Sequence, residues 1–548
     1  MTDVNTAAPS GPPADLPAAP SEGAPAASQR AGIVRAAGIN SLGNVASRVL
    51  GMVRGSVVAY VFGASGATGA FDAVQTVPKM VYELLIGGML SAALVPVLSE
   101  YADEERRAEM DHILSVLLTL AAIALVAVVL LLEVGAGVLV PLLVGGFEAD
   151  LLRTATLLTR VMVPAILIYG VSGLIQAYHL ARKEFVYPAM GGSAHNLGMI
   201  VTVLALSDRL DVSSLALGVV VAATAQLLVQ LPGLRGARLR VRVDWHHPVV
   251  RRILRLYAPV VLSIVVANVG IVIDRNLASR TLPQALTWMT RATELIQISL
   301  GLVSMAISMA VLPTLSQIDA RVELDRFKRT FTGGLRLVIA VIIPASVGLL
   351  VLGEPIVRLL FEHGEFTPAD TAQVSRALLY YLPGLPFAAI DLPLVFAFYA
   401  QKDTVTPVIV GILGVLVYLL VGPLLAFVAG WGYLGLVLAN SAQLISHALI
   451  MLFVFARRFE GLGGYAVWST TAKAAVASVA VGALALGSYT LLQAISPLPG
   501  LANEVLLVAV PGALGAGGYI LAARALGLEE ITALAGMLRR RLAPSRPA

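Results

Sequence analysis

Charged and polar residues recur at helical spacing inside the most apolar stretches of this sequence. In the first such stretch, Arg48 and Arg54 are accompanied by small and amide residues, namely Asn40, Ser41, Asn44, Ser47, Gly51 and Gly55. At 100° per residue, these positions fall within an arc of about 140° on one helix. Guanidinium groups bind phosphate through paired hydrogen bonds. The two arginines therefore predict a binding site for an anionic, phosphate-bearing headgroup.

Two further stretches carry polar stripes of the same kind. The second apolar stretch places Asp72, Gln75, Thr76, Lys79 and Glu83 on one face. The eighth places Thr287, Thr290, Glu294, Gln297, Gly301, Ser304 and Ser308 on one face, with Arg291 at its edge. An unpaired charge in hydrocarbon costs at least about 2.5 to 3.5 kcal/mol, so these side chains must face protein or water. We predict a hydrated cavity lined by cations; the alternative is that the charges pair across helices, or that Arg48 extends to the membrane surface.

The elements that carry these residues are apolar segments long enough to cross a membrane. Of the 548 residues, 58% are hydrophobic and only 13% are charged, about half the charge of a soluble protein. A span needs about 20 residues for roughly 30 Å of hydrocarbon. Such segments begin near Ile33, Phe71, Ile113, Leu152, Pro188, Ser213, Val249, Ala285, Phe331, Thr371, Val405, Tyr433, Ser469 and Val505. The sequence therefore predicts an all-α polytopic membrane protein with about 14 transmembrane helices.

Basic residues in the loops predict the orientation of these spans. Alternate loops hold eighteen arginines and lysines, whereas the intervening loops hold little beyond Arg153, Arg209, Arg280 and Arg358. Cytoplasmic loops retain Arg and Lys, so both termini are predicted to be cytoplasmic. Residues 1–29 are expected to form a disordered tail. Residues 527–548, with Arg539, Arg540 and Arg541, are expected to form a basic tail that lies on the anionic inner leaflet or is simply solvated.

An internal repeat divides the chain into two similar halves. Ala181–Pro188 matches Ala400–Pro407 at a separation of 219 residues, and Pro164 falls on Pro383 at the same separation. Leu94–Ser99 likewise matches Val311–Ser316. These matches predict a parallel pseudo-two-fold repeat of two six-helix lobes, an N-lobe (30–235) and a C-lobe (236–460), followed by two C-terminal helices (461–526). Repeats of this kind place a substrate path between lobes that move against each other.

Several function classes are disfavoured by composition and motifs. The net charge of +5 comes from basic residues scattered at span ends rather than gathered on one face, so no nucleic-acid partner is expected. The chain has no cysteine, which excludes disulfides and thiolate metal sites. No GxxxxGK[ST] loop, DDxxD cluster or HExxH motif occurs, so the sequence favours a transporter that is not an enzyme.

Several motifs together resemble those of one family of membrane transporters. They are Gly43–Arg54 (GNVASRVLGMVR), Val61–Ser65 (VFGAS), Ser91–Tyr101, Phe361–Phe366 and Lys402–Pro407. This combination, over residues 33–460, resembles the MurJ (MviN) family of lipid II flippases, within the multidrug/oligosaccharidyl-lipid/polysaccharide exporter superfamily. The resemblance implies fourteen spans in the bacterial inner membrane, with residues 461–526 forming a groove for the lipid tail. It also implies transfer of undecaprenyl-pyrophosphate-linked peptidoglycan precursor from the inner to the outer leaflet by alternating access.

The resemblance assigns roles to individual residues. Arg48 and Arg54 match the two essential arginines of the family's first helix. The family's arginines in the second and eighth helices fall at Tyr82 and Glu294, so that part of the cationic cluster is lost. Lys79 and Arg291 each lie one turn earlier on nearly the same face, and we expect them to supply the missing cations. Asp72, Glu83 and Glu294 are then expected to be their pairing partners in the gated states.

Sodium is the only candidate ion, and no other cofactor is expected. Some members of the family hold sodium near the seventh, tenth and eleventh helices. Asp274 matches one acidic ligand and Asp403 matches a second. The alternative is that Asp274 pairs with Arg275 or caps a helix, and that Asp403 caps the eleventh helix before Thr404.

Three other functions stay open from the sequence. The first is export of another lipid-linked polysaccharide, or drug antiport, by a member of the same superfamily. The second is a membrane enzyme acting on prenyl phosphates, which lacks the motifs it would need. The third is a scaffold that flips nothing. For the flippase, the expected partners are lipid II, membrane lipids and proteins of cell-wall synthesis.

Overall fold

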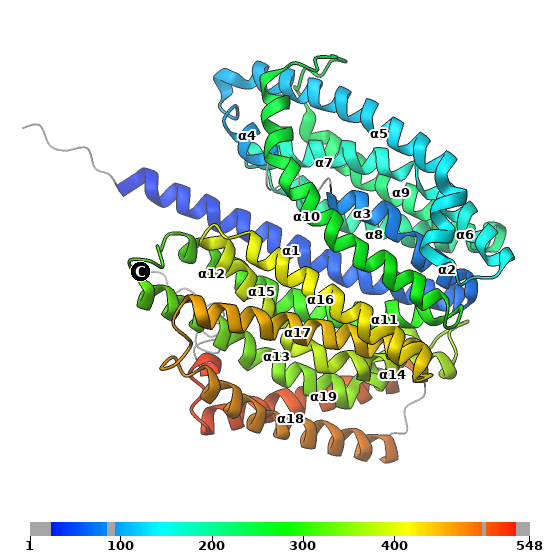
Figure 1. Cartoon of the computed structure of the whole chain (residues 1–548), viewed down its shortest axis with the longest axis vertical. Helices are drawn as coiled ribbons and strands as arrows, with labels where there is room; N and C mark the ends of the chain where they lie inside the picture. Colours follow the sequence, from blue (N-terminus) through cyan, green and yellow to red (C-terminus); the bar gives the residue numbers. More distant parts are fainter. Residues whose placement is uncertain (1–22, 85–93, 496–499, 533–548) are drawn as a thin grey trace, which may run out of the picture.

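The computed structural model describes residues 23–84, 94–495 and 500–532, and within them it is helical without strands (Figure 1). The first helices are α1 (Gly23–Phe62), α2 (Gly66–Val74), α3 (Thr76–Tyr82), α4 (Val95–Ser99), α5 (Arg107–Val144), α6 (Ala149–Met162), α7 (Ala165–Ala181), α8 (Val186–Leu210) and α9 (Ser213–Gln230). The others are α10 (Pro248–Ser279), α11 (Ala285–Leu300), α12 (Ala306–Ser316), α13 (Leu324–Phe361), α14 (Pro368–Tyr381), α15 (Leu385–Ala400), α16 (Val405–Pro423), α17 (Tyr433–Arg458), α18 (Val467–Ile495) and α19 (Gly500–Ala525). The all-α fold class is confirmed.

Twelve stretches of the described residues are long and apolar enough to cross a membrane. The two predicted spans outside this set begin near Phe71 and Val249. The first includes residues 85–93, which lie outside the described part of the chain, and the second is the helix α10. The protein is therefore polytopic, and the count of fourteen spans stays a prediction.

Prolines divide two of the spanning stretches at equivalent places. Pro164 separates α6 from α7, and Pro383 lies in the turn between α14 and α15. Proline lacks the N–H that a continuous helix would use, so the helix is interrupted there. Lys183 and Lys402, which follow α7 and α15, both adopt the left-handed conformation, with φ of 61° and 60°. Local structure thus recurs at the predicted separation, while the relation of the complete lobes stays a prediction.

The helices form two groups with α1 running between them (Figure 1). The N-lobe consists of α1–α9, with α1 packed along α8, and the C-lobe consists of α11–α17. The C-terminal helices α18 and α19 pack against each other and against α13. Helix α10 bridges the groups: it contacts α5 of the N-lobe and α11, α16 and α17 of the C-lobe.

The two ends of this bundle differ in sequence and in packing. At the basic end, α5 begins at Arg107 and α17 ends at Arg458, and the arginine-rich connections gather there. At the closed end, α1 ends at Phe62 and α13 ends at Phe361. One buried apolar cluster includes residues of both lobes, among them Phe71 and Phe361. The lobes are therefore packed together at the closed end.

Helix α1 starts earlier than the sequence predicted. It begins at Gly23, so the last residues of the predicted tail (1–29) are helical. The segment Ala24-Pro-Ala-Ala-Ser is rich in alanine, which has the strongest intrinsic helix propensity. Residues 1–22 and 533–548, including Arg539, Arg540 and Arg541, lie outside the described residues.

Candidate functional site

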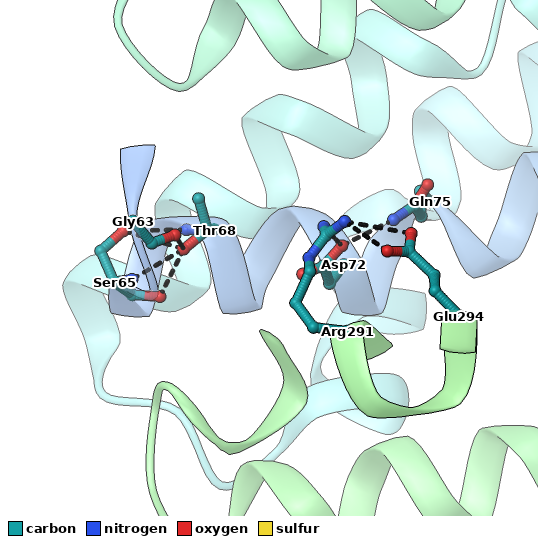
Figure 2. Close-up of polar contacts among 7 residues, drawn as sticks. All are labelled: Gly63, Ser65, Thr68, Asp72, Gln75, Arg291 and Glu294. Carbon is teal, nitrogen blue, oxygen red and sulfur yellow. Dashed lines mark hydrogen bonds and ion pairs between the residues drawn. The ribbon is translucent and has the colours of Figure 1, made fainter. Parts of the chain in front are cut away.

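A buried cluster of charges joins the two lobes near the closed end. Arg291 on α11 is only 4% exposed. Its Nη1 donates to Glu294 Oε2 at 2.8 Å, and its Nη2 lies 3.5 Å from Oδ1 of Asp72 on α2. Gln75 Nε2 also donates to that Asp72 oxygen at 2.9 Å (Figure 2). We call Asp72, Arg291 and Glu294 the interlobe ion cluster, because Asp72 belongs to the N-lobe and the other two to the C-lobe.

Local structure fixes the helices that carry this cluster. Helix α2 starts with a capping box in which Ser65 and Thr68 satisfy each other's backbone N–H groups (Figure 2). Helix α1 approaches the cluster through Gly55. A Cβ atom at this position would lie 2.9 Å from Glu294 Oε2 and 3.0 Å from Arg291 Nη1. The absence of a side chain at Gly55 therefore lets α1 lie directly against the cluster.

Backbone contacts seal the closed end beside the cluster. Glu365, in the turn after α13, donates its N–H to the carbonyl oxygen of Tyr60 at 2.9 Å. Gly63 and Gly364 have φ of 58° and 62°, which side chains rarely adopt. A Cβ at Gly364 would overlap the Tyr60 carbonyl, and one at Gly63 would overlap the Glu365 carbonyl. Two motifs noted in the sequence, Val61–Ser65 and Phe361–Phe366, thus meet here.

A third close approach seals the same end between α2 and the start of α11. A Cβ at Gly69 would overlap the carbonyl oxygen of Pro283. Sequence reasoning did not identify this closure. The sequence did contain a signal for it, namely Gly63 and Gly364 within the motifs Val61–Ser65 and Phe361–Phe366. Only the folded chain shows that these two glycines lie against each other's segment.

Arg48 lies on the seam between α1 and the C-lobe. Its Nη1 lies 3.4 Å from the carbonyl oxygen of Gln297 on α11, and its guanidinium fills the space where a side chain at Gly301 would stand. Arg48 and Arg54 are both half-buried. Arg54 lies within electrostatic range of Tyr169 and His195. Both arginines are therefore partly accessible, Arg48 on the seam with the C-lobe and Arg54 on the side of α1 that faces α7 and α8 of the N-lobe.

The remaining predicted residues on α3 are separate from this cluster. Lys79 and Glu83 are exposed, and neither forms an ion pair with any residue that the structure describes. The structure therefore brings Asp72, Glu294 and Arg291 together but leaves Lys79 and Glu83 outside. In this state the guanidinium of Arg291 is engaged by two carboxylates, whereas Arg48 and Arg54 have no carboxylate partner in the described chain.

The two candidate sodium ligands do not lie at one site. Asp274 on α10 accepts a hydrogen bond from Tyr418. Asp403 caps α16, accepting from the N–H groups of Val405 and Thr406 at 3.1 and 3.0 Å and pairing with Arg458. Thr406 and Tyr418 are twelve residues apart on α16, about 18 Å. Asp274 and Asp403 therefore lie near different ends of α16 and do not share one ion, and sodium binding itself stays a prediction.

Comparisons with known proteins match most of the chain. The family model described as "Lipid II flippase MurJ" matches residues 58–508. A probable lipid II flippase MurJ from Vibrio cholerae is 31% identical over 454 residues, which cover 80% of this chain and 86% of the relative. A lipid II flippase MurJ from Burkholderia cenocepacia is 28% identical over 75% of this chain and 81% of its own length.

Solved structures show the same fold at lower identity. A lipid II flippase MurJ in an inward closed conformation superposes with a TM-score of 0.72 at 22% identity, covering 89% of this chain and 99% of the other. An inward-facing multidrug transporter of the MATE family gives 0.66 at 13% identity, covering 76% and 95%. The chain thus has the fold that these two transporters share. The family model and the sequence identity to the Vibrio cholerae relative identify the family: the chain belongs to the MurJ family of lipid II flippases.

Proposed function

We propose that this protein moves lipid II, the prenyl-pyrophosphate-linked peptidoglycan precursor, from the inner to the outer leaflet of the bacterial inner membrane. Family membership supports the substrate class. The observation that carries the mechanism is the contrast between the half-buried arginines Arg48 and Arg54 of α1 and the buried interlobe ion cluster that lies against the same helix. The first can bind an anion, and the second can hold the path shut.

The orientation follows from the basic end. Arginine-rich connections are retained on the cytoplasmic side of bacterial membranes, so the basic end faces the cytoplasm and both termini lie there. The closed end then faces the periplasm. In this state the headgroup would enter from the cytoplasmic side, with its pyrophosphate against Arg48 and Arg54 and its prenyl tail in the lipid beside α18 and α19.

Opening the closed end would separate Asp72 from Arg291. Glu294, on the same helix as Arg291, would remain paired with it. The Nη2 group of Arg291, which faces Asp72, would therefore become available to another anion only when the lobes separate. Arg291 would thus replace the missing family cation in the outward state, and Lys79 would do so on the α3 face. A membrane potential, negative inside, favours outward movement of the anionic headgroup by about 2.3 kcal/mol per charge per 100 mV. No nucleotide is needed.

One alternative within the superfamily has specific support. The positions of the family's second-helix and eighth-helix arginines hold Tyr82 and Glu294, and the fold also matches a multidrug transporter. Export of a different lipid-linked saccharide, or of a drug, would need fewer cations on the seam.

Complementation of a conditional flippase-depleted strain separates these functions. Expression of this chain is expected to restore growth and cell shape, and the double variant R48E/R54E is expected to fail although it reaches the membrane. R153Q is the matched control, because Arg153 is an exposed surface arginine whose one ion pair within the described ranges is with Asp150. Growth restored by the double variant, or no rescue by the wild-type chain together with drug or polysaccharide export, would contradict the lipid II assignment.

A further inference from the structure

The connection between the lobes, residues 235–247, lies extended along α5 and is held there by its backbone. The N–H groups of Arg238, Arg240 and Arg242 donate to Asp111 Oδ2, Ser115 Oγ and Thr119 Oγ1, at 2.8, 3.1 and 3.0 Å. Four residues of helix rise about 6 Å, and two residues of extended chain rise about 6.6 Å, so the two spacings match. We call residues 235–247 the strap. Because Arg238, Arg240 and Arg242 are held through their backbone N–H groups, their side chains are left to contact something else.

The strap has two chemically different faces. Arg238, Arg240 and Arg242 alternate with Leu239, Val241 and Val243, and Trp245 continues the apolar series two residues further on. Alternation of this kind places the two sets on opposite faces of an extended chain. The apolar set is unusually exposed: Val241 is 87% exposed, Val243 59% and Trp245 55%. The strap arginines Arg235, Arg238, Arg240 and Arg242 are also exposed, and none forms an ion pair with a residue that the structure describes. A packed protein surface rarely leaves both faces open.

The position of the strap along α5 explains this exposure. Its farthest contact is with Thr119, about 6 Å before Ile123 along the helix. Ile123 begins the run of exposed apolar residues on α5 that continues through Val126, Leu130, Leu131, Val134, Val138 and Leu142, as expected of a face in contact with lipid. The chain then returns, and the ring of His247 lies 5.6 Å from that of His112. The strap thus reaches the boundary between lipid headgroups and hydrocarbon, where tryptophan is enriched.

We propose that the strap is a membrane-binding element that recognises anionic phospholipid in the leaflet at the basic end. Val241, Val243 and Trp245 enter the edge of the hydrocarbon, and the arginines bind headgroup phosphates. The charge is complementary, because the strap contains four arginines and one acidic residue, Asp244. Figure 1 shows the start of α5 at the outer margin of the N-lobe, away from the seam that contains α1, so this surface is distinct from the substrate path.

The consequence is a lipid anchor at the start of the bridging helix. Helix α10 begins at Pro248, directly after the strap, and Arg252 in its second turn is bound bidentately by Glu100 of the N-lobe at 2.7 and 2.6 Å. Anionic lipid therefore fixes the N-lobe end of α10 to the leaflet. This inference does not depend on which substrate the protein carries.

The depth of the strap in the membrane can be measured directly, because the chain has no native cysteine. V241C would be labelled with a polarity-sensitive fluorophore and reconstituted into vesicles of phosphatidylcholine, alone or with 30% phosphatidylglycerol. Quenching by lipids brominated on the acyl chain reports insertion. V322C is the matched control: Val322 is 80% exposed at the same end, but it precedes the charged first turns of α13, with Arg326 and Arg329.

We expect at least twofold more quenching at V241C than at V322C, and a further increase with phosphatidylglycerol. The triple variant R238Q/R240Q/R242Q keeps the backbone hydrogen bonds to α5, and it should abolish the increase with anionic lipid. Equal quenching at V241C and V322C would overturn the proposal. Insertion that is indifferent to phosphatidylglycerol would overturn it as well, because the arginines would then have no part in binding.

Discussion

Arg291 and Asp72 lie 219 residues apart in the sequence, yet their side chains, both almost fully buried, meet at 3.5 Å between the lobes. A buried ion pair contributes little net stability compared with apolar packing, but removing one partner leaves a costly uncompensated charge. Such a pair is better suited to holding a movable contact closed than to stabilising a permanent core, since it forms only when the two lobes are packed together. Opening would require another partner for Arg291.

Neutralising Asp72 should therefore weaken the closed end. D72N keeps the shape of the side chain but leaves Arg291 with Glu294 alone, and we expect a loss of about 1 to 3 kcal/mol for the closed state. Spin labels at D150C and A369C, both exposed at the closed end on opposite lobes, would report a longer distance population. E354Q, which breaks an exposed surface pair with Arg358, should change the distances little. Unchanged distances in D72N would show that the cluster is not a gate.

A methyl group at Gly69 should have the same effect by steric overlap. G69A places a Cβ against the Pro283 carbonyl, so the lobes must separate there to accommodate it. G137A is a matched control, because Gly137 also lies within a helix but has open space around its Cβ; it should be neutral or stabilise by up to about 1 kcal/mol. The D150C/A369C distance distinguishes them. If the two variants behaved alike, the close approach of α2 and Pro283 would not be what seals this end.

Much of the fold follows from the sequence, because lengths of apolar residues determine where helices cross a membrane. The polar stripes also indicated that Arg291 must face protein or water. Whether Arg291 faces protein or water could not be predicted, because its partner Asp72 belongs to the other lobe and reaches it only when the lobes pack together. The capping role of Asp403 was one of the local alternatives, as it accepts from the N–H groups of Val405 and Thr406. Its pairing with Arg458 and the bond between Tyr418 and Asp274 depend on tertiary packing. The alternation of arginine and apolar residues in the strap was visible in the sequence. There, however, the arginines predicted only that this loop is cytoplasmic.

Asp403 is expected to act as a helix cap. D403A should destabilise the protein by about 0.5 to 2 kcal/mol, because the N–H groups of Val405 and Thr406 lose their acceptor. D403N should retain most of the stability, since an amide oxygen also caps helices. Thermal unfolding in detergent, compared between sodium and potassium chloride, should show no preference in any variant. Selective stabilisation of the wild type by sodium, lost in D403N, would restore Asp403 as an ion ligand.

The ion pair between Glu100 and Arg252 should be lost at acidic pH. The hydrogen bonds from Arg252 hold the pKa of the Glu100 carboxyl below its ordinary value of 4.5. A carboxyl whose pKa is lowered by folding stabilises the folded state above its unfolded pKa, and this contribution is lost as the pH falls through the folded value. Wild type should therefore unfold at a higher temperature than E100Q at pH 7, and the difference should shrink progressively as the pH falls below 4.5. A difference that stayed constant as the pH was lowered through and below 4.5 would refute this assignment.

Arg48 and Arg54 of α1 are proposed to bind the anionic headgroup of lipid II while it passes between the lobes. The most direct test is leaflet-resolved transport of lipid II in vesicles containing the purified protein. R48Q and R54Q should each slow transport by about tenfold to a hundredfold, because each removes charge-assisted hydrogen bonds worth about 1.5 to 3 kcal/mol. R153Q should transport like the wild type, and unchanged D150C/A369C distances would show that the variants fold. Wild-type transport rates in the double variant R48E/R54E would show that these arginines do not bind the headgroup.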